Sequence, residues 1–185
     1  MIFFLISDKG CSVSLSGFGN SDPDGMTAWI YINGQRIVHT PITHDIPSLF
    51  MVTLNMTYTT CEVMASVVYD TFSSASARQE AVDFLNELPS GTLVIGVSAD
   101  TLTSTTLGQN LAAFYDITTV YGVDLANVPY RGSIAFIAVK DSPEKAFVHQ
   151  SLEEDGPAHI AKVLRPFHEE GEYLVLQNRF FSFCF

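Results

Sequence analysis

Basic residues are scarce in this sequence. Its 185 residues include only 9 Lys and Arg against 20 Asp and Glu, which gives a formal net charge of −11. Contact with the phosphate backbone of a nucleic acid requires a basic surface, and so does attraction to anionic lipid headgroups. The composition therefore argues strongly against a nucleic-acid-binding protein, and it disfavours binding to an anionic membrane.

Long hydrophobic runs are also lacking. The apolar stretch Met1–Ile6 is too short to span a bilayer, and no basic residue precedes it as in a secretory signal peptide. We therefore expect residues 1–9 to form the first strand and expect no membrane insertion. Because 47% of the residues are hydrophobic, the chain can bury one sizeable core, and we expect a single domain over residues 1–185.

Two kinds of covalent modification bear on the chain. Cysteine is limited to Cys11, Cys61 and Cys184, a set that matches no metal-binding spacing. One disulfide with one free thiol and three buried thiols are both compatible with this set. Asn55-Met56-Thr57 matches the motif for N-glycosylation, but its position in an expected strand disfavours occupancy.

The first half of the sequence has the pattern of a strand-rich fold. Residues 29–38 alternate around Asn33-Gly34, which is the strongest hairpin signal in the chain. Further strands are expected at residues 49–54 and 62–68, where β-branched and aromatic residues are frequent.

An amphipathic helix followed directly by a buried strand is predicted near the middle of the chain. The helix spans Ala75–Leu88, begins with a capping box of Ser76 and Gln79, and ends at a Pro-Ser-Gly turn. The continuous apolar run of residues 93–97 predicts a strand covered on both faces. Apolar residues share one face of the helix, and Arg78, Gln79, Glu80, Asp83 and Glu87 fill the other.

Beyond this strand the patterns are weaker. A second helix is expected at about residues 105–115, and weak patterning allows a third helical segment between residues 146 and 161. Residues 171–185 predict one or two terminal strands as an extension of the domain. The phenylalanines of residues 180–185 either complete the core or form a subunit contact.

The order of these features resembles the interleukin-like EMT-inducer domain over about residues 29–140. The resemblance depends on Val67-Val68-Tyr69-Asp70-Thr71-Phe72, on the helix–turn–strand unit of residues 84–97, and on the strand around Tyr130-Arg131-Gly132. That domain is found in cytokine-like proteins, in cell-surface hyaluronan-binding proteins and in the stem of a protein O-mannose N-acetylglucosaminyltransferase. Where the family usually has an acid pair and two tryptophans, this chain has Asp100 alone, Tyr130 and Ile134.

Three kinds of catalytic or metal chemistry are disfavoured by the sequence. Ser98 half-resembles a nucleophile elbow, but the glycine required two residues later is Asp100. A metal site at His39, His44 and Asp45, or among the dispersed His149, His159 and His168, is less expected than surface histidines. Asp70, the other acid at a strand end, is expected to cap backbone N–H groups in a turn rather than to act in a glycosidase pair.

A constellation suited to sugar recognition remains. An aromatic ring stacks on a pyranose, and planar charged groups bind its hydroxyl or acetamido groups. Tyr130, Arg131 and Asp100 supply these groups, and the family resemblance implies that Asp100 and Arg131 match residues of the glycan pocket in the transferase stem. A structural ion pair between Asp100 and Arg131 is the competing interpretation.

We therefore expect an α+β domain with two packed antiparallel β-sheets and two or three helices. Its expected function is that of a non-enzymatic, extracellular or secreted lectin for glycans or glycoproteins, without cofactor or metal. The resemblance implies N-acetylhexosamines as ligands, and weak single pockets favour a homo-oligomer. The alternative is a secreted cytokine-like signalling protein that binds a protein receptor, because one fold can serve both functions.

Overall fold

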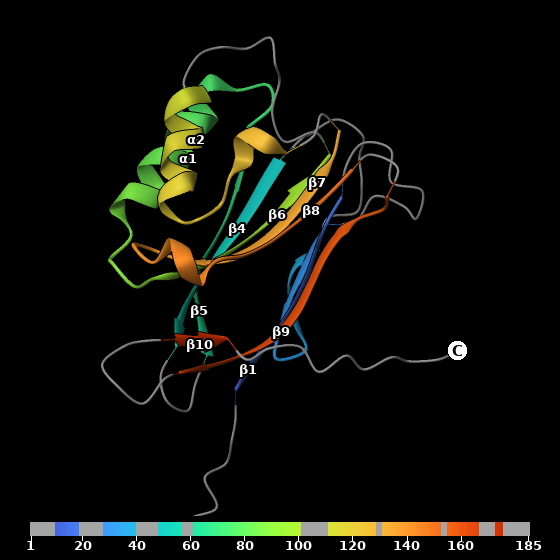
Figure 1. The fold of residues 1–185 in the computed structure, drawn as a ribbon, viewed down its shortest axis with the longest axis vertical. Helices are drawn as coiled ribbons and strands as arrows, with labels where there is room; N and C mark the ends of the chain where they lie inside the picture. Colours follow the sequence, from blue (N-terminus) through green and yellow to red (C-terminus); the bar gives the residue numbers. More distant parts are fainter. Residues whose placement is uncertain are drawn as a thin grey trace, which may run out of the picture.

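The computed structural model describes residues 10–18, 28–39, 48–56, 61–100, 111–128, 131–152, 155–166 and 173–175. Within these residues, two five-stranded antiparallel sheets pack together, and two α-helices cover the outer face of the second sheet (Figure 1). The predicted α+β class with two packed antiparallel sheets is confirmed. The expected first strand at residues 1–9 lies outside the described residues.

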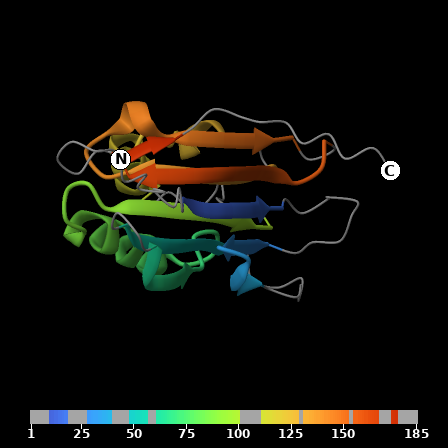
Figure 2. The same ribbon diagram turned by 90° about the horizontal axis from the view of Figure 1, so that it is seen from below.

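The first sheet is built from both ends of the described chain. Its strand order is β10-β9-β1-β2-β3, and Figure 2 shows β9 (orange-red) alongside β1 (blue). The predicted hairpin around Asn33-Gly34 is confirmed, with Asn33 at φ 51° and Gly34 at φ 76° as a tight hairpin turn requires. The strands are β1 (Cys11–Gly17), β2 (Trp29–Ile32), β3 (Gln35–His39), β9 (Ala158–Pro166) and β10 (Tyr173–Val175).

The second sheet is built from the middle of the chain, in the order β5-β4-β6-β7-β8. The helices α1 and α2 lie between its strands in the sequence and pack on its outer face. The elements are β4 (Ser48–Met56), β5 (Cys61–Tyr69), α1 (Ala75–Glu87), β6 (Leu93–Ala99), α2 (Leu111–Val120), η1 (Leu125–Asn127), β7 (Ser133–Val139), η2 (Pro143–Lys145) and β8 (Phe147–Ser151).

The strands β6 and β7 form the middle layer of the molecule. Every residue of both strands is buried, because one face contacts the first sheet and the other contacts the helices. This arrangement explains why residues 93–97 are continuously apolar rather than alternating. The prediction that this strand is covered on both faces is confirmed.

The N-terminus of α1 differs from the predicted capping box. Ser74 is the N-cap, and its hydroxyl oxygen accepts a hydrogen bond from the N–H of Ala77 at 3.1 Å. Ser74 has the extended backbone that an N-cap requires, whereas Ser76 lies inside the first turn. The assignment of Ser76 and Gln79 as the capping box was therefore wrong by two residues.

Arg78 was placed on the solvent face of α1, and this prediction was also wrong. Its side chain is only 1% exposed. The guanidinium donates hydrogen bonds to the carbonyl oxygens of Thr71 at 2.8 Å and Phe72 at 3.2 Å. A buried arginine is stable in such a place because it satisfies carbonyl groups of the β5–α1 turn.

The C-terminal third contains strands where a third helix had been allowed. Residues 147–151 and 158–166 are β8 and β9, separated by a turn with Gly156 at φ 86°. The strand β8 pairs with β7 from Phe147, opposite Ile137, to Ser151, opposite Ser133, and Phe147 packs against the core between the sheets. The second helix, α2, continues to Val120, five residues beyond its predicted end, and residues 105–110 lie outside the described residues.

A disulfide between Cys11 and Cys61 joins β1 of the first sheet to β5 of the second, with their Cα atoms 5.8 Å apart. It closes a chain segment with a sequence separation of 50 residues. A cross-link that closes a loop of this length restricts the unfolded chain, and this restriction stabilises the fold by about 4 kcal/mol. Of the two cysteine arrangements compatible with the sequence, the structure has the disulfide, and Cys184 lies outside the described residues.

Candidate functional site

Charged residues flank the strands of the second sheet at one end of the sheet, where some strands finish and others begin. The strands β5, β6 and β8 end at this edge, and β4 and β7 begin there, as the antiparallel pairing requires. Asp70 follows β5, Asp100 follows β6, and Arg131 precedes β7. We call this the Asp100 edge, which is at the top of Figure 1, and we call the opposite end of the same strands the Lys140 edge.

The strands β6 and β7 separate near the Asp100 edge. Their regular pairing ends at Val97 and Ala135, after which the Ser98 hydroxyl accepts a hydrogen bond from the N–H of Ile134 at 2.9 Å. The N–H of Phe18, at the end of β1, donates to the carbonyl oxygen of Ser98 at 3.0 Å. The first sheet is thereby fixed to the second at this edge.

The close approach of β1 to this edge depends on Gly17. A Cβ atom at this position would lie 2.2 Å from the carbonyl oxygen of Ile134. Only glycine fits such a contact without moving the backbone. Ser98 is fully buried beneath it, so its hydroxyl serves the backbone and is not placed as a surface nucleophile.

Asp100 and Arg131 share an uncommon backbone conformation. Their φ angles are 62° and 61°, in the left-handed region that costs a residue with a Cβ atom about 1–2 kcal/mol. Aspartate is among the residues enriched in this region, but arginine is not. Backbone strain of this kind is found most often at functional sites.

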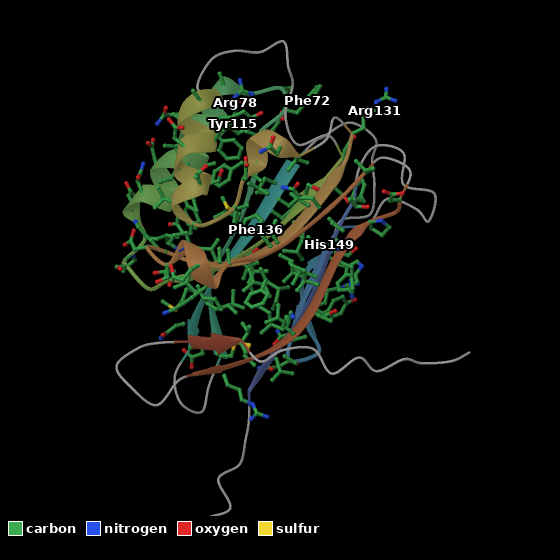
Figure 3. All side chains as sticks on the ribbon, viewed as in Figure 1. Phe72, Arg78, Tyr115, Arg131, Phe136 and His149 are labelled. Atoms are coloured by element: carbon green, nitrogen blue, oxygen red, sulfur yellow. A yellow bond between two sulfur atoms is a disulfide. The ribbon has the colours of Figure 1, made fainter. Side chains whose placement is uncertain are left out.

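The strand order places the two residues at neighbouring strand ends. Asp100 directly follows β6, Arg131 stands two residues before β7, and these two strands pair with each other. Arg131 is half-buried, and in Figure 3 its guanidinium extends beyond the end of β7, away from the sheet. Tyr130, the third predicted ligand-binding residue, lies outside the described residues.

Asp70 occupies the same edge but has a structural task. One of its carboxylate oxygens accepts a hydrogen bond from the N–H of Ser73 at 2.9 Å, and the other accepts from the Ser73 hydroxyl. Arg78 fixes the same turn through the carbonyl groups of Thr71 and Phe72, and Figure 3 shows Phe72 and Arg78 at this end of the molecule. The structure therefore shows the turn acid that the sequence predicted, together with a role of Arg78 in the same turn that the helical pattern did not indicate.

Two of the dispersed histidines lie side by side in the fold. The N–H of His159 in β9 donates to the ring Nδ1 of His149 in β8 at 2.9 Å. Burial of the His159 ring, together with the nearby His149, lowers the pKa of His159 below its usual value of 6.5. The described part of the chain contains no group of three or more His, Cys, Asp or Glu side chains placed to hold a metal ion. Of the other candidate ligands, His44, Asp45 and His168 lie outside it.

An open hollow adjoins the start of β7. It lies at the end of β8, where Ser151 pairs with Ser133 of β7. The hollow therefore extends the Asp100 edge along β8. Its lining residues are His149, Gln150, Ser151, Leu152, Asp155 and Pro157.

These features define a class of protein: a two-sheet α+β sandwich with helices on one face and a strained, charged sheet edge. Residues 47–142, more than half of the chain, match the interleukin-like EMT inducer family, and the chain belongs to this family. The matched segment contains β4–β7 and both α-helices, and hence Asp100 and Arg131.

No curated protein matches the chain. Among the helices of the described ranges, none is long and apolar enough to cross a membrane.

Proposed function

We propose that the protein is a non-enzymatic lectin that binds glycans containing N-acetylhexosamines at the Asp100 edge. In this proposal the Arg131 guanidinium donates paired hydrogen bonds to the acetamido carbonyl or to hydroxyl oxygens of the sugar. The Asp100 carboxylate accepts hydrogen bonds from sugar hydroxyls, and the Tyr130 ring stacks on the C–H face of the pyranose. No metal or cofactor takes part.

The observation that carries the proposal is the paired left-handed conformation of Asp100 and Arg131 at adjacent strand ends. A buried ion pair could form between two charged residues on ordinary strand backbone, so an ion pair alone does not require this strain. Left-handed residues other than glycine cluster at functional sites, and here two charged ones stand at neighbouring strand ends. Both residues also lie within the segment that matches the family.

Two observations support a binding function rather than catalysis. The hydroxyl of Ser98 is buried and accepts a backbone hydrogen bond, and the carboxylate of Asp70 is held by Ser73. An activated nucleophile or a general acid at this edge would need these groups to face a substrate.

The disulfide supports an extracellular location. Structural disulfides persist in oxidising compartments and are rare in the cytosol. Multivalency supports a homo-oligomer, because several weak pockets on one particle raise avidity by about 10²–10⁴. Light scattering of the purified chain tests the oligomer, and a monomer at all working concentrations would contradict it.

A glycan array followed by calorimetry tests the lectin proposal. We expect binding to terminal N-acetylhexosamines, and we expect Arg131→Ala to weaken it about 10–150-fold, the effect of losing about 1.5–3 kcal/mol of charged hydrogen bonding. Arg36→Ala is the matched control, because Arg36 is an exposed arginine on β3 of the first sheet. An array without any bound glycan would contradict the proposal.

Receptor binding is the rival function, and a specific surface favours it. The strand β5 exposes Val63, Met64 and Val68 to solvent, and protein partners commonly bind exposed apolar surfaces. A blank glycan array together with saturable, Met64-dependent binding to a cell-surface protein would favour this rival.

A further inference from the structure

Asn55 lies near the end of β4, at the Lys140 edge. It is the first residue of the motif Asn55-Met56-Thr57, and its side chain is exposed. Its strand neighbours Leu54 and Met56 are buried in the core between the sheets, so the Asn55 side chain points to the opposite face. Although Asn55 lies in a strand, its side chain is therefore on the surface, as a glycan-bearing asparagine requires.

The neighbouring strand β5 presents an apolar edge. It is nine residues long and lies at the end of the sheet order, paired within the described residues with β4 only. Met64 is 64% exposed, Val68 53% and Val63 39%. Val63 and Val68 pair with residues that face the core between the sheets, so these two valines lie on the other face of the sheet from Asn55. A long edge strand with apolar side chains is a template for pairing with another chain, so proteins protect such edges.

The structure shows partial protection of this edge. The pairing of β4 with β5 shifts register between Thr53 and Leu54, which leaves Met64 without a Cα partner in a β-bulge. A bulge interrupts regular pairing, and the charged Glu62 opposite Asn55 adds to this effect. Neither device covers the Met64 side chain.

We propose that Asn55 carries an N-linked glycan that covers the Met64 side chain on β5. The donor is a lipid-linked oligosaccharide pyrophosphate of the secretory pathway. The amide Nδ2 of Asn55 bonds to the anomeric carbon of the first sugar, the bond from that carbon to the pyrophosphate oxygen breaks, and the amide loses one proton. Polyprenyl pyrophosphate is the leaving group, and no oxidant or reductant is required.

The position of Asn55 fits this modification in two ways. The disulfide of Cys61, which pairs with Met56 in the same hairpin, indicates an oxidising compartment, where N-glycosylation also takes place. Asn55 is also seven residues along β4 from Ser48, or about 23 Å at the rise of a β-strand, so the glycan leaves the Asp100 edge accessible. The inference therefore does not depend on the lectin proposal.

The test is secretion of the full chain from eukaryotic cells, followed by intact mass measurement before and after treatment with a peptide N-glycosidase. We expect the wild-type chain and Thr57→Ser to lose the mass of one glycan on treatment. Thr57→Ala and Asn55→Gln should show no change, because both destroy the motif that Thr57→Ser preserves. A wild-type chain with the mass of the bare polypeptide would overturn the proposal.

Masking of β5 is tested on the folded, secreted protein, so that no variant needs to fold without its glycan. After enzymatic deglycosylation we expect sedimentation to shift toward larger species as the protein concentration rises, and we expect Met64→Lys to abolish this shift. Unchanged sedimentation after deglycosylation would overturn the masking role. So would reduced association, because that result would mean that the glycan itself links the molecules.

Discussion

The two ends of the β6–β7 strand pair differ in how they use polar groups. At the Lys140 edge, backbone hydrogen bonds join Gly91 to Lys140 at 3.1 Å and Lys140 to Thr92 at 3.0 Å. The Lys140 ammonium also donates to the carbonyl oxygens of Leu85, Asn86 and Leu88, which end helix α1. Helix C-termini leave such carbonyls without intrahelical partners and attract positive charge.

At the Asp100 edge the same two strands separate. The buried Ser98 hydroxyl takes the place of a regular strand pair, and the two charged residues that follow are in left-handed conformations. Asp141, at the Lys140 edge, has the same φ of 62° in a turn directly after Lys140, so each edge has a left-handed aspartate, and the Asp100 edge has a left-handed arginine as well. One edge is thus built to close the fold, and the other keeps charged side chains at strand ends at a conformational cost.

Removal of the disulfide should have the largest effect on stability, because the bond joins the sheets near the Lys140 edge. We expect the double variant Cys11→Ser, Cys61→Ser to lose about 4 kcal/mol of unfolding free energy, a large part of the 5–15 kcal/mol of a typical domain. Denaturant unfolding under non-reducing conditions measures this loss. Sugar affinity per folded molecule should not change, and a parallel loss of affinity would show that the two edges are coupled.

Lys140→Met should have the next largest effect. The variant keeps the length of the side chain but leaves three carbonyl oxygens without the ammonium, so we expect a loss of about 2–3 kcal/mol in unfolding free energy. The same denaturant experiment measures it. Retained stability would mean that water replaces the ammonium at the end of α1. The polar groups of the Lys140 edge would then contribute no more to stability than those of the Asp100 edge.

A smaller, pH-dependent effect is expected at the start of β9. The pKa of His159 is lowered in the folded state below its usual value of 6.5, mainly by burial of the ring. The unfolded chain therefore binds the proton more readily, so the contribution of His159 to stability is present above pH 6.5 and is lost as the pH falls through the folded-state pKa. Urea unfolding between pH 5 and 8 should show this decline, and His159→Gln should flatten it. An equal decline in the variant would assign it to other groups.

Local patterns were sufficient to predict the elements that local forces determine. Alternation identified the Trp29–Val38 hairpin, helical periodicity identified α1, and a continuous apolar run identified β6. The segment of residues 146–161 was misread because two short strands around a turn give too few residues to establish a period. Helical periodicity alone assigns Arg78 to the solvent face. The guanidinium is buried because it donates to the carbonyl groups of Thr71 and Phe72, and the helical pattern contains no information about these groups.

Features that depend on pairing between distant segments could not be predicted in the same way. The Cys11–Cys61 bond requires the packing of two sheets, and the contact of His149 with His159 requires β8 to lie beside β9. Asp100 and Arg131 were selected as separate residues, and only the register of β6 with β7 brings them to the same edge. The left-handed backbone of Arg131 had no signal in the sequence, because arginine is not enriched in this conformation, and for Asp100 the only signal was the general enrichment of aspartate.

The central claim is that the Asp100 edge is strained for binding, and Arg131→Gly tests it most directly. Glycine adopts the φ of 61° without a Cβ penalty, so we expect the unfolding free energy to stay within about 1 kcal/mol of the wild-type value or to rise, while sugar binding is lost. Asp141→Gly is the matched control at the Lys140 edge and should leave sugar affinity unchanged. Clear destabilisation of Arg131→Gly, with affinity per folded molecule retained, would show that Arg131 is structural and would contradict the account.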